Sequence, residues 1–194
     1  MGHTGQAAAV ARLETGRAAF ATFLWRITAC HALTYLIAGM IAYAVFDYKS
    51  LFETGPLAAL MRPMDSPWIA AGPSLQIIRG LIFAVALYPF RKVFLEERNG
   101  WLKLWGLFVG LAILSTAGPS PGSVEGFIYT KLPLLSHLRG MPEVLAQTAA
   151  LSAVLVAWYR TPRRAWNIGM GIAVGLVLLM GAAALLAPRP EAFK

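Results

Sequence analysis

Residues 165–187 read AWNIGMGIAVGLVLLMGAAALLA, a stretch of the chain without a single charged side chain. About 20 apolar residues cross the hydrocarbon core of a bilayer, so this stretch predicts a membrane-spanning helix. The whole chain has a matching composition: of 194 residues, 58% are hydrophobic and 13% are charged, and the mean hydropathy is +0.61. Such values exclude a soluble globular domain and predict an integral membrane protein.

Four other apolar runs precede this stretch, and prolines or charged clusters separate them. The predicted spans are 18–46, 74–95, 101–117, 143–159 and 165–187. Pro89 predicts a kink near the end of the second span. We therefore expect an all-α, polytopic membrane helix bundle of about five transmembrane helices, folded as a single unit over 18–187. A polar segment at 1–17 precedes it, and a short tail at 188–194 follows it.

The chain carries 17 Lys and Arg against 9 Asp and Glu, a net charge of +8. In a membrane protein the positive-inside rule accounts for such an excess, so we expect no nucleic-acid partner. Five helices place Arg12, Arg17, Arg91, Lys92, Arg98, Lys103, Arg160, Arg163 and Arg164 on one side, and Lys49, Arg62, Lys131, Arg139, Arg189 and Lys194 on the other. This bias predicts a cytoplasmic N-terminus and an extracytoplasmic C-terminus, with the bacterial inner membrane as the default location.

Two connections on the predicted outer side, 47–73 and 118–142, are much longer than the inner turns. Together they hold eight of the twelve prolines. Loops of this length usually have a role. Both contain apolar segments, so we expect them to lie against the bundle or in the headgroup layer. A role in contacting membrane lipids or other membrane-protein subunits follows as a hypothesis.

Arg79 is the most suggestive single residue, because a charged side chain at the centre of a membrane helix costs about 2.5–3.5 kcal/mol on insertion scales. Such a charge requires a partner. Gln76 lies on the same helical face, and several polar residues fall on the same outer side. The candidate ligand or partner contacts are Arg79, Gln76, Asp65, Arg62, Glu125, Lys131, His137, Arg139 and Glu143. They predict either an anion or headgroup site, or a salt bridge that ties an outer loop to the second helix.

Small residues recur four positions apart in two of the predicted helices. Gly106 and Gly110 lie on one face of the third helix, and Gly171 and Gly175 lie on one face of the fifth. Glycines at this spacing allow another helix to approach closely. We expect them to pack helices within the bundle, with oligomerisation as the alternative.

No catalytic or cofactor motif is present in the sequence. Ser123, Glu125 and His137 allow a serine–histidine–carboxylate arrangement only if the fold brings them together. A bis-histidine haem at His31 and His137 is disfavoured, because the two residues are predicted to lie at different depths. Metal-binding spacings such as HExxH are also missing. We therefore predict no catalytic residue, no metal and no cofactor.

Three functions remain as hypotheses. The first is a non-catalytic membrane protein, either an accessory subunit of a complex or a small lipid- or ligand-binding protein that acts through its outer loops. The second is a small transporter or channel with an anion or headgroup site near Arg79, lined also by Gln76, Glu143 and Gln147. The third is a membrane enzyme that acts on a lipid-linked substrate.

Overall fold

The computed structural model describes residues 3–114, 118 and 120–187, with side chains from Gly16 onward, and within this part it contains helices and no strand. The helices are α1 (His3–Val45), α2 (Tyr48–Glu53), α3 (Pro67–Leu87), η1 (Tyr88–Phe90), α4 (Arg91–Leu95), α5 (Gly100–Leu107), η2 (Phe108–Leu114), α6 (Val124–Tyr129), α7 (Leu134–Arg139), α8 (Met141–Arg160) and α9 (Arg164–Leu186). The chain is thus an all-α protein, as its apolar runs predict.

Among the described residues, four helical segments are long and apolar enough to cross a membrane. They are Gly16–Val45, Pro67–Leu95, Leu134–Arg160 and Arg164–Leu186. A fifth apolar segment, Gly100–Leu114, is shorter. At 1.5 Å per residue it extends over about 22 Å, less than the ~30 Å hydrocarbon core. The end of the predicted span 101–117 and the tail at 188–194 lie outside the described residues.

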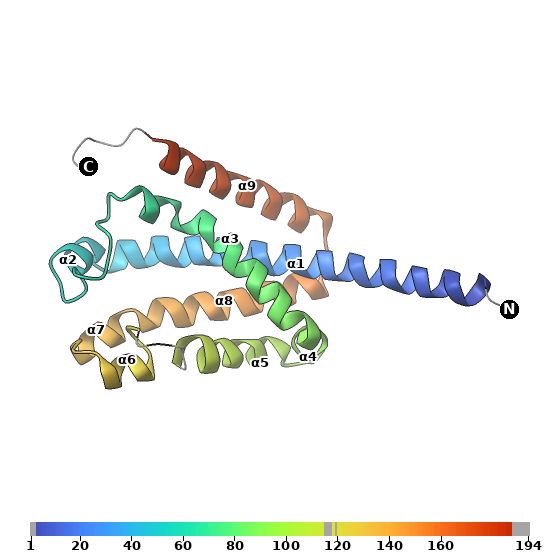
Figure 1. The fold of residues 1–194 in the computed structure, drawn as a ribbon, viewed down its shortest axis with the longest axis horizontal. Helices are drawn as coiled ribbons and strands as arrows, with labels where there is room; N and C mark the ends of the chain where they lie inside the picture. The colour runs from blue at the N-terminus through green and yellow to red at the C-terminus, as the bar shows by residue number, and fades with distance from the viewer. Residues whose placement is uncertain (1–2, 115–117, 119, 188–194) are drawn as a thin grey trace.

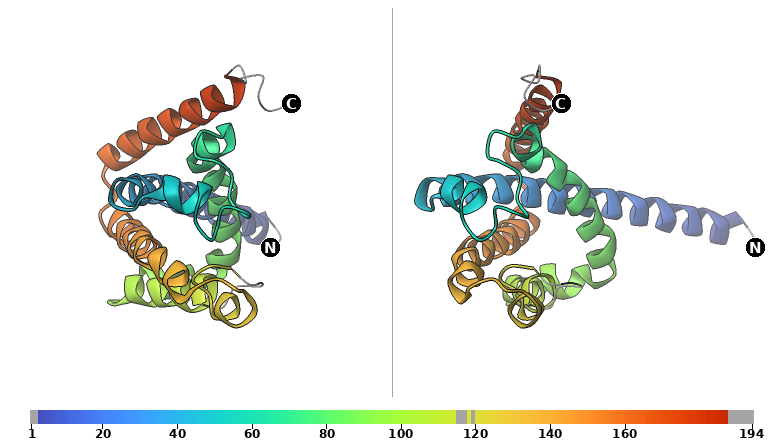
Figure 2. Two further views of the ribbon diagram at one scale, coloured as in Figure 1. Left: turned by 90° about the vertical axis from the view of Figure 1, so that its left-hand side faces the viewer. Right: turned by 60° about the vertical axis from the view of Figure 1, so that its left-hand side comes forward.

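Helix α1 forms the centre of the bundle (Figure 1), and its N-terminal part extends well beyond the other helices. α3 crosses α1 on one side, α8 packs against it on another, and α9 packs mainly on α3 (Figure 2). α5 packs against α8. The crossing of α1 and α3 is very close, because a Cβ atom on Gly80 would lie 2.7 Å from the Cα atom of Thr28.

Two features of the second long segment differ from a single regular helix. α3 begins at Pro67 rather than at 74, because proline at the first helical positions loses no intrahelical hydrogen bond. Its α-helical part ends at Leu87, and the residues around Pro89 form the 3₁₀ turn η1. The chain then continues as α4 in another direction (Figure 1). The interruption falls where the sequence predicts a kink.

The two long connections fold into short helices at the end of the bundle opposite the α4–α5 turn (Figure 1). The side chain of Asp47 accepts a hydrogen bond from the Ser50 amide at the start of α2, over 3.1 Å. In the second connection, Ser123 Oγ caps α6 by accepting from the Gly126 amide over 2.8 Å. Such caps satisfy helix-end amides that would otherwise lack partners. Each of the two connections therefore contains a short helix with a side-chain N-cap.

The four glycines predicted to pack helices have open space beside them in the described part of the chain. A Cβ atom on Gly106, Gly110, Gly171 or Gly175 would meet nothing within 4 Å. Close helix contact occurs instead at isolated glycines, such as Gly80 against α1 and Gly181 against Ser74. Packing at these four glycines stays a prediction, because a small-residue spacing shows where a helix can approach and not which face meets one.

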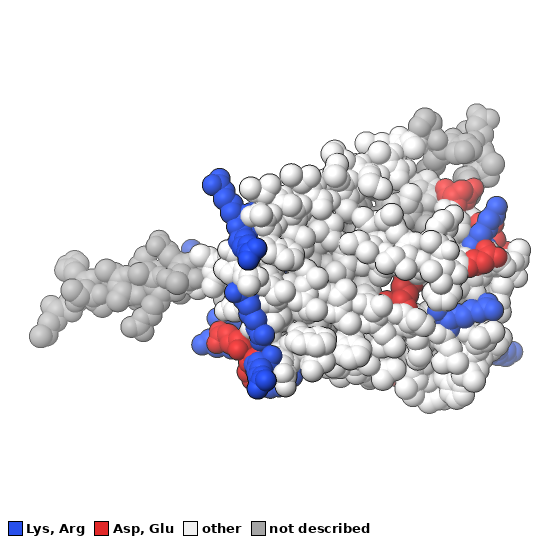
Figure 3. Space-filling view, turned by 180° about the vertical axis from the view of Figure 1, so that it is seen from behind, with Lys and Arg blue, Asp and Glu red and all other residues white. Residues whose placement is uncertain are grey.

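The charged side chains form two groups at opposite ends of the bundle (Figure 3). In this view Lys and Arg dominate one end, both signs occur at the other, and the surface between them is almost entirely uncharged. A wide uncharged belt between two charged ends is typical of a protein that crosses a bilayer.

Candidate functional site

A hydrogen-bonded polar cluster lies about halfway along the long helices. His31 of α1 is 2% exposed. Its Nε2 atom donates to Gln76 Oε1 on α3 over 3.1 Å, since an amide oxygen can only accept. Its Nδ1 atom accepts from Gln147 Nε2 on α8 over 3.3 Å. One buried histidine thereby joins three helices.

Gln147 extends this cluster along α1. It is 7% exposed, and its Nε2 atom also donates to Thr34 Oγ1 over 3.3 Å. Thr34 in turn donates to the Cys30 carbonyl of its own helix over 2.7 Å. Buried polar groups of this kind are stable only when they are paired, and these pairings fix the positions of the side chains.

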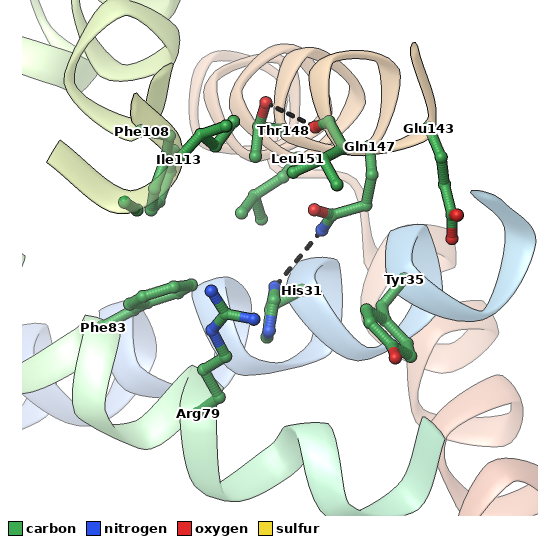
Figure 4. A pocket seen from close by; sticks show the side chains of 12 residues that line it. His31, Tyr35, Arg79, Phe83, Phe108, Ile113, Glu143, Gln147, Thr148 and Leu151 are labelled. Carbon is green, nitrogen blue, oxygen red and sulfur yellow. Dashed lines mark hydrogen bonds between the residues drawn. The ribbon is translucent and has the colours of Figure 1, made fainter. Parts of the chain in front are cut away.

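The cluster borders a cavity of about 70 Å³. This is several times the volume that one water molecule requires. Figure 4 shows the cavity between α1, α3, η2 and α8, with the guanidinium of Arg79 directed into it beside His31. Phe83 and Phe108, whose ring centroids are 5.0 Å apart, line it where α3 meets η2.

Arg79 has no ion pair and no hydrogen bond to any residue in the described part of the chain. Its guanidinium lies over the ring of Phe83, 5.4 Å from the centroid. Arg79 is near the middle of the Pro67–Leu95 segment, yet its side chain is exposed. The cavity is therefore open on the side of Arg79, and a cationic group is accessible there at mid-depth of the bundle.

Glu143 lines the same cavity, one turn before Gln147 on α8. Its carboxylate accepts a hydrogen bond from the Tyr48 hydroxyl of α2. Burial and this bond to Glu143 both raise the pKa of Tyr48 above its usual value. Glu143 is thus held by α2 and is not paired with Arg79.

The structure divides the predicted contact residues into two groups. Arg79 and Glu143 line the cavity, and Gln76 holds the histidine beside it. The others lie in the two connections at one end of the bundle, where Arg62, Asp65, Lys131 and Arg139 are exposed and Glu125 is half-buried. Arg62 stacks over Trp68, 5.6 Å from the ring centroid. These five do not line the mid-bundle cavity.

His137 has a local role in the second connection. It is 3% exposed, and its Nδ1 atom accepts from the Gly122 amide over 3.2 Å. Its Nε2 atom lies 3.4 Å from Thr130 Oγ1. Ser123 is bonded to backbone groups of its own turn and not to His137. The serine–histidine arrangement required for a nucleophile is therefore not formed, and His31 and His137 bind different partners.

His31 and Thr34 belong to this site but are not among the contact residues predicted from the sequence. Both lie in a long apolar helix, where a histidine or threonine commonly only packs or bonds its own helix. The available signal was the occurrence of polar residues at matching depth in three different spans: His31, Gln76 and Gln147. That signal becomes specific only when the rotation of each helix is known.

Comparisons of the chain with protein-family models, with curated proteins and with solved structures give no match.

Proposed function

We propose that this chain is a multi-pass membrane protein that binds the anionic group of a ligand at Arg79, inside the helix bundle. The observation that carries the proposal is the unpaired Arg79 guanidinium, directed into a mid-bundle cavity beside the fixed His31–Gln147 pair. Ionisable residues within membrane spans are rare and generally mark functional sites. An arginine without an acidic partner is best completed by an anion from outside the chain.

The chemistry of the cavity favours a carboxylate or a phosphate group. A guanidinium presents several N–H donors in one plane, which matches two oxygens of such a group. The amide hydrogens of Gln147 bind His31 and Thr34, and the Thr148 hydroxyl donates within its own helix, so Arg79 supplies the donors for an anion in this cavity. Glu143 lies on the α2 side of the same cavity and bonds Tyr48. This arrangement disfavours a second negative charge near Glu143 and orients the ligand with its charge toward Arg79.

Either a soluble anion or the charged head of an amphiphile has this chemistry. The cavity volume of about 70 Å³ suits a small group and not a whole lipid. An amphiphile would place only its head there, with its chain outside in the bilayer, since the Arg79 side of the cavity is open. Membrane lipids are thus included among the proposed partners.

The proposed arrangement in the membrane has five crossings, with α5 and η2 as a short fifth span. Figure 1 supports it, because α1, α3, α5, α8 and α9 run alternately between the two ends. The basic residues at the α4–α5 end favour a cytoplasmic location for that end. The N-terminus is then cytoplasmic, and α2, α6 and α7 lie on the outer side. We propose the bacterial inner membrane as the location.

Thermal unfolding in an uncharged detergent tests the proposal. Oleate and dodecyl phosphate would report an amphiphile, and acetate and inorganic phosphate a soluble anion, with oleyl alcohol as the uncharged control. We expect either the two amphiphiles or the two soluble anions to raise the melting temperature by several degrees. Oleyl alcohol should leave the melting temperature unchanged. Arg79→Gln should remove the effect.

The matched control is Arg62→Gln, which removes the same charge from an exposed position over Trp68. This variant should respond to anions as the unchanged protein does. Stabilisation that persists in Arg79→Gln, or the absence of stabilisation by all four anions, would refute the proposal.

A second candidate function is that of an accessory subunit of a membrane complex, the hypothesis that the two long loops suggest from the sequence. A specific observation favours it: apolar side chains are exposed on α6 and α7, namely Phe127, Ile128, Tyr129, Leu134, Leu135 and Leu138. Exposed apolar clusters often mark contacts with a partner or with lipid. Native mass spectrometry after gentle extraction should then detect a second polypeptide, which Ile128→Ser with Leu135→Ser would release. Detection of the lone chain in the unchanged protein would contradict this candidate.

A further inference from the structure

A second cavity lies toward the end of the bundle where basic residues gather, and its lining on α1 and α8 is separate from that of the Arg79 cavity. It has a volume of about 420 Å³ and lies between α1, α4 and α8. Phe23 and Leu155 form part of its apolar wall, and Arg26, Arg91 and Tyr159 add polar groups. It thus combines an apolar surface with two guanidinium groups close to the end of the membrane-spanning region.

Arg26 is the central residue of this cavity. Its Nε atom is buried, and it has no hydrogen-bond partner among the described residues. The guanidinium lies over the ring of Trp158, 5.4 Å from the centroid, and Trp158 is fully buried. The indole therefore fixes the position of the cation. The terminal N–H groups of this guanidinium have no hydrogen bond to any described residue, so they can donate to an acceptor that enters the cavity.

Arg91 is also fixed in place. Its guanidinium lies over the ring of Tyr88, 4.0 Å from the centroid, and its Nη1 atom donates to the Tyr88 carbonyl over 3.1 Å. Tyr88 itself donates to the Gly16 carbonyl of α1 over 3.2 Å. The second arginine is thus tied to α1 through Tyr88, and its remaining N–H groups are free to bind an anion.

From this geometry we infer that the cavity binds the phosphate of an anionic glycerophospholipid, with Arg26 and Arg91 as its donors. The apolar wall would accept the first part of an acyl chain, which a free phosphate cannot use. Basic pockets between membrane helices on the cytoplasmic side are suited to anionic headgroups. This site is separate from the Arg79 cavity and does not depend on the function proposed for it.

Two neighbouring charges affect where a phosphate can bind and how its binding must be tested. Glu96 also lines the cavity and would repel a phosphate placed beside it, so the headgroup must lie toward Arg26. The same end carries exposed basic residues such as Arg164, and these attract any anionic bilayer without a specific site. A test must therefore separate binding in the cavity from attraction to the whole basic end.

Native mass spectrometry makes this separation. The intact protein in an uncharged detergent is incubated with equal amounts of phosphatidylglycerol and phosphatidylcholine that carry the same acyl chains. We expect one phosphatidylglycerol to be retained in preference to phosphatidylcholine. Arg26→Gln should lower that retention about tenfold, because a charge-assisted hydrogen bond is lost. Arg164→Gln, which removes an equal charge outside the cavity, should leave it unchanged.

Further measurements keep the outcome decisive. Arg26→Lys retains the charge and should preserve part of the binding, and circular dichroism checks that each variant is folded. Equal losses in Arg26→Gln and Arg164→Gln would overturn the site in favour of general attraction. Competition by soluble glycerol phosphate at similar concentration would overturn the lipid assignment. If the unchanged protein shows no preference between the two lipids, the inference is wrong even without the variants.

Discussion

Arg26 and Arg79 are two arginines of helices long and apolar enough to cross a membrane, in similar local settings and at different positions along the bundle. Each guanidinium lies 5.4 Å from the centroid of an aromatic ring, Trp158 in one case and Phe83 in the other. Neither forms an ion pair within the described part of the chain. Arg26, however, lies at the basic end of the bundle, whereas Arg79 lies near the middle of its span beside the His31–Gln147 pair.

The difference in depth determines what each arginine requires. A side chain near the end of a span can extend to the headgroup layer, where water and phosphate are available. A charge at the middle of the span must be stabilised from within the bundle. The polar cluster around Arg79 and the apolar wall around Arg26 are consistent with these two requirements. The following predictions test the comparison, from the largest expected effect to the smallest.

Gly80→Leu should have the largest effect, because it separates α3 from α1 and so displaces Arg79 from the cavity. A Cβ atom at Gly80 already meets the backbone of Thr28, which cannot move aside easily. We expect a loss of about 3 kcal/mol or more in the free energy of unfolding, measured in mixed detergent micelles. Gly106→Leu is the control, since a Cβ there meets nothing within 4 Å and should cost less than about 0.5 kcal/mol.

Removing each arginine without added anions or lipids should give opposite signs. Arg79→Leu should increase the free energy of unfolding by up to about 3 kcal/mol, because an unpaired charge leaves the middle of the span. Arg26→Leu should decrease it by about 1 kcal/mol, because contact with Trp158 is lost near the end of the span. Unfolding in the same micelles measures both. A decrease in both variants would show that Arg79 is structural and that depth makes no difference.

Gln147→Leu tests how much the hydrogen bonds of the polar cluster contribute to stability. The substitution leaves His31 Nδ1 and Thr34 without their donor in a buried place. We expect a loss of about 1–3 kcal/mol in the free energy of unfolding. In Thr148→Val, by contrast, only a hydroxyl bonded within its own helix is removed, and the loss should be below about 1 kcal/mol. Similar losses in the two variants would indicate that the bond to His31 contributes no more to stability than the Thr148 hydroxyl does.

Tyr48→Phe should have the smallest effect, about 1 kcal/mol, because one hydrogen bond to Glu143 is lost. Its pH dependence is more informative. Burial and the bond to Glu143 raise the pKa of Tyr48, so the folded state retains this proton after the unfolded state begins to lose it near pH 10. Stability should therefore fall above about pH 10, and less so in Tyr48→Phe. Identical pH profiles would contradict the burial of this hydroxyl.

The sequence allowed the long helices to be anticipated but not their contacts. Hydropathy marks 165–187 and 143–159 closely, because crossing a bilayer requires nearly every side chain there to be apolar. The start of α3 was placed too late, since Pro67 and Pro73 resemble loop residues until the helix is seen to begin with one of them. The π-helix η2 carries no sequence signal of its own.

Part of the candidate site could be predicted from the sequence. Arg79, Gln76, Glu143 and Gln147 stood out as polar residues in apolar surroundings, and the fold brings them to one cavity or its border. Arg26 gives no such signal in the sequence, because its position over Trp158 depends on how α1 faces α8. The four spaced glycines form a regular pattern, yet among the described residues nothing lies within 4 Å of a Cβ atom placed on any of them.

The sequence by itself determined that this protein is an all-α protein with long apolar helices, because composition and run length alone decide whether a helix is apolar enough for a bilayer. The tertiary structure decided which polar residues share a cavity. A helix rotates all of its side chains together, so a shift of one residue in its orientation turns a residue such as His31 from a partner of Gln147 into one facing lipid. That rotation depends on contacts such as Gly80 against Thr28, which join residues distant in the chain.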